Sequence, residues 1–500
     1  MQSPRSSEID LRTRYAMALT LLLATVLRVH HIDFHGIWSD ELASLDYARR
    51  NASAIIFGPD YDYHPPLYYL FLHYWLKIVS LSEISVRIPS VFFGVLSVLM
   101  TYILGSKLFR PYVGLIAAIF ICISPWHIVY SGVARMYTPL LFFSICSTYF
   151  LFLLLENKSK WNLFFYVLTT VTALYLHNMA VFMVVGQNIY YIGRWALTRR
   201  QAGETVSLVR WCLVQIAIVA VFSPWIMVTL FVKLSQMQGN YWVEREPLYR
   251  YLGGVVFIFA GTTRYLATYF LAPWLCVLAL LGTVQAGRLV SRTGPDPSGR
   301  AFFRSPDRTG VFWALLVVPP ALTAIASQFI QPFFVPRSFV ASSVALFVLA
   351  AAGIATLPAR HRPLVLTITL AAAVAVLGQS YMDKVERGYR QPILAVLKQA
   401  APGDAIIIDK SSGTYYLRQL TDRTDLRYGD ASDVVARDRQ FVSGHCTLFA
   451  DRRIWTIRAS RKPDWPKFLE LLTSSGLQVI DTITLGHKST IDVFACQQSR

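Results

Sequence analysis

Residues 86–106 read VRIPSVFFGVLSVLMTYILGS, an apolar run whose only charged side chain is Arg87. An α-helix needs about 20 predominantly apolar residues to cross the hydrocarbon core of a bilayer. This run is therefore predicted to be a transmembrane helix. Ten further runs of the same character are predicted as spans, at 15–31, 112–130, 137–155, 161–176, 179–196, 207–231, 265–287, 311–330, 337–357 and 363–381.

The composition of the whole chain agrees with many spans. Of the 500 residues, 54% are hydrophobic and 15% charged, and the mean hydropathy is +0.44. In soluble proteins, about 45–50% of the residues are apolar and about 25% are charged. A soluble multidomain enzyme is therefore nearly excluded. The six cysteines form no CxxC pair, which excludes a disulfide-framework scaffold and a zinc ribbon.

The net charge of +18 indicates the orientation of the spans. In a soluble protein it would suggest a nucleic-acid partner, but in a membrane protein Lys and Arg concentrate in cytoplasmic loops. With the N-terminus inside, eighteen basic residues fall on that side, from Arg5 to Arg362. We therefore expect no nucleic acid partner, a cytoplasmic N-terminus and, after eleven spans, an outer C-terminus. Arg28 and two histidines follow the apolar core 15–27 of the first span, where a signal peptide would have a small-residue cleavage site, so this span is predicted to be an uncleaved anchor.

Residues 382–500 differ from the membrane part at 1–381. Charges are frequent there, and short β-like runs at 405–408, 453–457 and 491–495 are interspersed with helix-like stretches. The pattern predicts a small α/β domain on the outer face. Cys446 and Cys496 could pair in an oxidising compartment, and two unpaired thiols are an equal alternative.

The first outer loop, residues 32–85, is rich in ionisable and aromatic side chains. Asp40 and Glu41 are adjacent, and helix-like stretches at 41–50 and 67–78 could lie along the membrane surface. Acidic residues beside a membrane are costly without a task or a partner. The alternative for this pair is capping of a helix N-terminus.

Four arginines stand at the outer ends of predicted spans, where the positive-inside rule gives them no use: Arg87, Arg135, Arg264 and Arg337. The guanidinium fork fits phosphate oxygens, although pairing with Asp33, Asp60, Glu83 or a helix carbonyl would also accommodate each. Carboxylates facing arginines suit a sugar carried on a lipid phosphate, because the arginines stabilise the departing phosphate. Neither GxxxxGK[ST] nor GxGxxG occurs in a nucleotide-binding framework.

Four motifs carry a family resemblance: WSDE at 38–41, HPPLYY at 64–69, SEISVRIPS at 82–90 and SPWHIVYSGVARMY at 124–137. In this order they resemble the bacterial glycosyltransferase family 39 and 83 type of the glycosyltransferase C superfamily, similar to protein O-mannosyltransferases and the lipid A aminoarabinose transferase. The match is specific over about 150 residues and extends in span arrangement to about residue 380. It implies an inverting transferase with a polyprenyl-phosphate sugar donor on the outer leaflet.

The resemblance implies roles for individual residues. Asp40 would be the general base and Glu41 would position the acceptor, a metal or Asp40; His64, Arg135, Tyr137 and Arg337, with Arg264, would contact the donor. The sequence departs from the family at Arg337, which is followed by Ser338 instead of tyrosine. A divalent cation is left open: the potential ligands His35, Asp40, Glu41, Asp62 and His64 match no defined metal motif.

The expected function is thus sugar transfer in the plasma membrane of a bacterium to an envelope acceptor: lipid A or lipopolysaccharide, a polysaccharide, a glycolipid or a protein hydroxyl. A transporter or flippase of lipid-linked sugars would also need intramembrane arginines. A non-catalytic assembly subunit on the same fold is the third alternative.

Overall fold

The computed structural model describes residues 11–30, 32–33, 36–58, 64–157, 159–198, 206–229, 247, 251, 265–290, 301–329, 334–382, 389–408, 425–430, 453–458, 470, 472–473, 477–485 and 489–496. The chain divides into two compact units. The first contains Met1–His30 and Tyr47–Met382, and the second contains His31–Asp46 and Asp383–Arg500.

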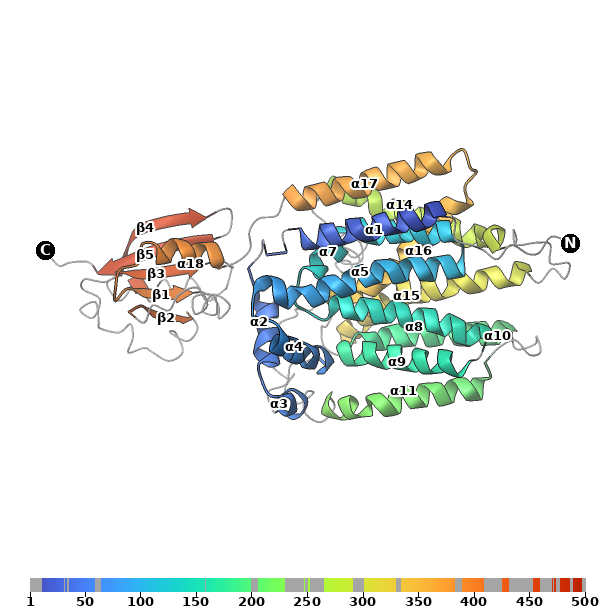
Figure 1. The fold of residues 1–500 in the computed structure, drawn as a ribbon, viewed down its shortest axis with the longest axis horizontal. Coiled ribbons are helices and arrows are strands. Elements are labelled where there is room, and N and C mark those ends of the chain that lie inside the picture. Colours follow the sequence, from blue (N-terminus) through green and yellow to red (C-terminus); the bar gives the residue numbers. More distant parts are fainter. Residues whose placement is uncertain are drawn as a thin grey trace. The chain divides into compact units, whose positions relative to one another are not determined.

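The first unit is a bundle of long helices that run side by side (Figure 1). Two short helices, α3 (Ala52–Phe57) and α4 (Leu67–Ile78), gather at one end of the bundle. The remaining elements of the bundle are α1 (Leu11–Val29), α5 (Glu83–Leu108), α6 (Pro111–Ile123), α7 (Pro125–Ser131), α8 (Tyr137–Asn157), α9 (Lys160–Leu176), α10 (Ala180–Thr198), α11 (Leu208–Val228), α14 (Leu266–Val290), α15 (Ala301–Phe329), η3 (Pro336–Phe339), α16 (Val340–Thr356) and α17 (Arg362–Met382).

Every apolar run predicted from the sequence coincides with a helix or with two consecutive helices. Within the described residues, seven helices are long and apolar enough to cross a membrane. The consecutive pair α6 and α7, bent by 62°, passes the same test together. The prediction of a polytopic helical protein is confirmed, and the number of eleven spans stays a prediction.

Burial separates a central helix from peripheral ones. The candidate span that contains α16 is 89% buried, whereas that of α17 is 17% buried. Large apolar side chains on α1, α11 and α17, such as Leu19, Leu213 and Leu364, are exposed. In lipid these faces are solvated by acyl chains, so the exposed side of the bundle is compatible with a bilayer.

Glycines permit a close helix contact between α14 and α16. A Cβ atom added at Gly353 would lie 1.9 Å from the carbonyl oxygen of Leu278, and one at Gly282 would lie 2.4 Å from that of Leu349. Small residues at such crossings let backbones approach and gain dispersion contacts that lipid cannot replace. Substitution at Gly353 therefore has to move a backbone.

A buried arginine holds the break between α6 and α7. Pro125 begins α7 and has no N–H to donate to the carbonyl of Ile121, four residues earlier. The guanidinium of Arg28, from α1, donates to the carbonyl oxygens of Ile121 at 3.1 Å and Cys122 at 3.2 Å. Its Nε donates to Ser131 Oγ at 3.1 Å, and Arg28 is only 2% exposed. Arg28 thus replaces backbone donors that the bent helix lacks.

The second unit contains most of α2 (Ser39–Ala48), the helix α18 (Arg390–Leu397) and a five-stranded sheet of order β2-β1-β3-β5-β4. The strands are β1 (Ala405–Ile408), β2 (Arg427–Asp430), β3 (Ile454–Arg458), β4 (Leu477–Leu485) and β5 (Ser489–Cys496). β1 is parallel to β2 and β3, while β5 is antiparallel to β3 and β4. The three predicted strands coincide with β1, β3 and β5.

The start of β1 is fixed by a buried carboxylate. Asp404 is 2% exposed and accepts hydrogen bonds from Trp455 Nε1 at 2.8 Å and from the backbone N–H of Arg453 at 3.0 Å. These bonds satisfy the buried charge and tie β1 to β3.

Candidate functional site

Arg135 lies in the turn between α7 and α8 and is 5% exposed. Its Nη1 atom is 3.5 Å from the hydroxyl of Tyr69, which belongs to α4. The backbone of this turn is attached to α5, because Ser90 donates to the carbonyl of Arg135 at 3.4 Å and Thr138 donates to that of Ser90 at 2.9 Å. Arg87, one turn before Ser90 on α5, is 1% exposed. Two arginines on neighbouring segments are therefore buried, one in the first turns of α5 and one in the turn before α8.

An aromatic and imidazole cluster forms beside this turn. The ring centroid of His177 lies 4.5 Å from that of His64 and 6.0 Å from that of Tyr137. Tyr137 in turn packs edge-on against Tyr130 at 4.9 Å. His64 and Tyr137 were both predicted from the motifs, and the structure brings them together through His177. The three side chains come from the segment before α4, the start of α8 and the break between α9 and α10.

His177 is the residue that sequence reasoning missed. A signal was present, since His177 and Asn178 are the two polar residues that separate the predicted spans 161–176 and 179–196. The predicted orientation places this short turn on the outer side, together with the first loop. Its single histidine matches no motif by itself.

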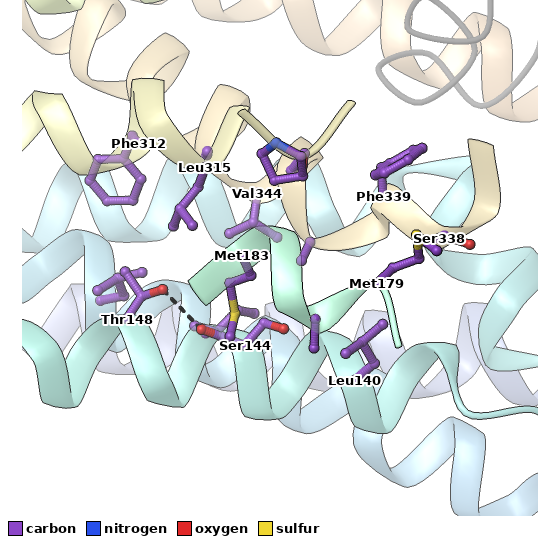
Figure 2. Close-up of a pocket in the computed structure, with 17 residues that line it drawn as sticks. Leu140, Ser144, Thr148, Met179, Met183, Phe312, Leu315, Ser338, Phe339 and Val344 are labelled. Atoms are coloured by element: carbon purple, nitrogen blue, oxygen red, sulfur yellow. Dashed lines mark hydrogen bonds between the residues drawn. The ribbon is translucent and has the colours of Figure 1, made fainter. Parts of the chain in front are cut away.

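A small pocket lies between helices of the same bundle (Figure 2). Side chains from α8 and α10 face side chains from α15 and α16 across it, among them Leu140, Met183, Leu315 and Val344. Its lining is predominantly apolar, with hydroxyls from Ser144, Thr148, Ser338 and Ser342. A slot of this kind between transmembrane helices suits a hydrocarbon chain.

One rim of this pocket adjoins the cluster. Met179 lines the pocket, and its backbone N–H donates to His177 Nδ1 at 3.1 Å. Leu140, another lining residue, lies one helical turn after Tyr137 on α8. Ser338 lines the pocket directly after Arg337, which is half-buried in η3. The segments that carry His177, Tyr137 and Arg337 therefore also contribute residues to the lining of the apolar pocket.

The acidic pair stands in the first turn of α2. Glu41 is 1% exposed, and its Oε2 accepts a hydrogen bond from the backbone N–H of Trp38 at 3.4 Å. The Glu41 side chain thus reaches back from the first turn of α2 and caps the backbone at the start of the helix. Asp40 is half-exposed. The two carboxylates therefore differ in burial.

Some predicted positions lie outside the described residues: Arg264, His35 and Asp62, as well as Cys446 and the side chain of Cys496. The structure therefore does not address the predicted disulfide. Over the described ranges, no three His, Cys, Asp or Glu side chains come close enough to hold a metal ion.

Residues 63–228 match the family model of the dolichyl-phosphate-mannose-protein mannosyltransferases. This range includes His64, Arg135, Tyr137 and His177 and leaves out Asp40. No curated protein matches the chain.

Two solved structures share the fold. ArnT from Cupriavidus metallidurans, bound to undecaprenyl phosphate, is 13% identical with a TM-score of 0.55 over 97% of this chain and 98% of that chain. An oligosaccharyltransferase from Archaeoglobus fulgidus, tethered to an acceptor peptide, is 10% identical with a TM-score of 0.50 over 84% of this chain and 64% of that chain. The family match over residues 63–228 and the fold shared with ArnT agree with the resemblance carried by the motifs of the first 150 residues.

Proposed function

We propose that this protein transfers one sugar, with inversion, from a polyprenyl-phosphate donor to an acceptor in the bacterial cell envelope. The observation that carries the proposal is the turn before α8, where Arg135 contacts Tyr69 and the following Tyr137 packs with His177 and His64, together with the apolar pocket in the same helix bundle. A lipid-linked sugar phosphate has both parts, an anionic headgroup and a long hydrocarbon tail.

The phosphate is assigned to the cluster. A buried guanidinium in a membrane protein is costly unless an anion or several acceptors surround it. Arg135 is 5% exposed and the neighbouring Arg87 is 1% exposed. Their positive charges would stabilise the charge that grows on the donor phosphate as the bond to the sugar breaks. Arg337, at the rim of the pocket, and Arg264 are proposed as further phosphate contacts.

The tail is assigned to the pocket between α8, α10, α15 and α16. Its lining is apolar over most of its area and begins at Leu140 and Met179, next to the cluster. The fold of ArnT, whose structure contains undecaprenyl phosphate, agrees with a lipid of this class.

Asp40 is proposed as the general base. The acceptor hydroxyl would attack the anomeric carbon from the face opposite the phosphate, Asp40 would take the hydroxyl proton, and the bonding pair would leave with the lipid phosphate. A single displacement inverts the configuration at that carbon. The acceptor class comprises lipid A, polysaccharide, glycolipid and protein hydroxyls.

The proposed setting is the plasma membrane, with eleven spans, a cytoplasmic N-terminus and a soluble domain after residue 382 on the outer side. The basic residues at alternate span ends support this orientation. The exposed apolar faces of α11 and α17 support contact with lipid.

The test uses purified full-length protein in proteoliposomes, with radiolabelled undecaprenyl-phosphate sugars and an envelope extract as acceptor. Chemical transfer is measured as label that leaves the lipid and enters the acceptor. We expect transfer by the wild-type protein and none by Asp40→Asn, which should reach the membrane at normal abundance and still bind donor. Movement of intact donor across the bilayer without transfer would instead indicate a flippase. Substantial transfer by Asp40→Asn would overturn the assignment of the base.

A further inference from the structure

We propose that Thr138 is a positioning residue of the donor site, whose hydroxyl holds the turn that carries Arg135 against the helix that carries Arg87. The two guanidinium groups would then act on one donor phosphate. Thr138 would act through the arginines without touching the donor. The inference rests on the proposed function and adds a residue that no charge or motif role identifies.

The hydroxyl of Thr138 bonds to a helix other than its own. Thr138 stands in the first turn of α8, is 1% exposed and donates to the carbonyl oxygen of Ser90 on α5 at 2.9 Å. Other buried threonines of the bundle, such as Thr101 and Thr148, donate to the carbonyl oxygen four residues earlier in their own helix. The hydrogen bond of Thr138 is therefore a cross-link between α5 and α8.

The cross-link is reciprocal and lies one helical turn from each arginine. Ser90 is 0% exposed, and its hydroxyl donates to the backbone carbonyl of Arg135 at 3.4 Å. Arg87 stands three residues before Ser90, and Arg135 stands three residues before Thr138. The two hydrogen bonds thus hold one arginine-bearing segment on the other. A charged hydrogen bond requires a heavy-atom separation of about 2.7–2.9 Å, so a small displacement of the turn would weaken a phosphate contact.

The segment around Arg87 has a separate anchor. Pro89 has no N–H to donate to the carbonyl of Ser85, four residues earlier in α5. Trp75 of α4 donates to this carbonyl instead, from its Nε1 at 2.8 Å. Loss of the Thr138 hydroxyl is therefore expected to displace the turn before α8 and to leave the start of α5 in place.

The experiment compares two lipids that differ only in the headgroup, undecaprenyl phosphate and undecaprenol. Binding of each to the full-length protein in nanodiscs gives the phosphate preference, defined as the ratio of the two affinities. It is measured for the wild type, for Thr138→Val, which removes the hydroxyl and keeps the shape, and for Thr138→Ser, which keeps the hydroxyl. Thr101→Val is the matched control, because Thr101 is 0% exposed on α5 and its hydroxyl bonds within its own helix.

We expect Thr138→Val to lower the phosphate preference by about threefold to tenfold, the range that one neutral hydrogen bond covers. Thr138→Ser and Thr101→Val should keep it within about twofold of the wild type. In an Arg135→Ala background, Thr138→Val should cause no further loss, because residues that act through one another have non-additive effects. Thermal unfolding verifies the folding of each variant, and Thr138→Ala carries the test if Thr138→Val does not fold.

Four outcomes would count against the inference. An unchanged phosphate preference in folded Thr138→Val overturns it, as does an equal loss of affinity for both lipids, which would indicate packing alone. A preference as low in Thr138→Ser as in Thr138→Val also overturns it. A full additional loss in the Arg135→Ala background would show that Thr138 does not act through Arg135. A wild-type protein with no preference for undecaprenyl phosphate would overturn the proposed function itself, which separates the two failures.

Discussion

Replacing Arg28 with methionine should destabilise the helix bundle while leaving the chain in the membrane. Methionine has a similar length and no donors. The guanidinium donates to the carbonyl oxygens of Ile121 at 3.1 Å and Cys122 at 3.2 Å, and to Ser131 Oγ. The substitution would remove the donor from all three acceptors. The net change in stability also depends on the removal of the buried charge.

The magnitude follows from opposing contributions. Each buried carbonyl left without a donor costs about 1–3 kcal/mol, which gives about 2–6 kcal/mol for the two. Removal of the buried guanidinium recovers part of its desolvation cost, and hydrogen bonds within membrane bundles are often worth less, about 0.6 kcal/mol on average. We expect a net loss of about 2–4 kcal/mol from these principles.

The assay is reversible unfolding in mixed micelles, followed by tryptophan fluorescence, with Arg14→Met as the control. Arg14 lies on the same helix and is exposed, so its loss should change the unfolding free energy by less than about 0.5 kcal/mol. Arg28→Lys should not restore stability, because one ammonium cannot reproduce a planar fork that serves several acceptors. If Arg28→Met is as stable as the wild type, the claim that the guanidinium stabilises the bundle by donating to the carbonyl oxygens at the break between α6 and α7 is refuted.

Three further predictions concern the site and the bundle. Glu41→Gln should lower stability by up to about 1 kcal/mol, through the weakened cap, and keep transfer within a few fold in the labelled-donor assay; complete inactivity of the folded variant would move the base from Asp40 to Glu41. Arg135→Ala should raise the donor KM about tenfold or more by removing a charged hydrogen bond, so an unchanged dependence of the rate on donor concentration would contradict the phosphate assignment. Gly353→Ala should strongly reduce the thermal stability of the purified protein, because the added methyl would overlap the backbone of α14. Gly378→Ala is the control, because no atom lies within 4 Å of its added Cβ, and it should leave the stability unchanged. Equal melting temperatures of the two variants would show that the contact between α14 and α16 relaxes easily.

The helices could be predicted because their cause is local. A run of apolar residues long enough to cross a bilayer must satisfy its own backbone, and in lipid a helix is the structure that does so. The segment at 86–106 illustrates this, since it lies wholly within α5. The bend in the predicted span 112–130 had a visible sign as well, Pro125, although hydropathy alone predicted a single helix.

The site was only partly predictable, because its contacts join distant segments. His64 and Tyr137 stand in motifs with other polar residues, which identified them. His177 stands alone between two apolar runs, and its meaning depends on ring contacts with both. Arg28 similarly looked like a flanking charge after the first span, because no pattern along the chain shows that it reaches carbonyls more than 90 residues away.

The hydrogen bonds from Arg28 to the break between α6 and α7 also have a consequence for the assembly of the protein in the membrane. Spans are inserted one after another, and the segment that contains α6 and α7 would enter the bilayer with a backbone carbonyl that no amide of its own can serve. The donors come from α1, which is synthesised earlier and must therefore still be present in the membrane when the bent span arrives. The first helix then acts as an internal folding template for the third span, and a chain deprived of it should accumulate at this step and be degraded.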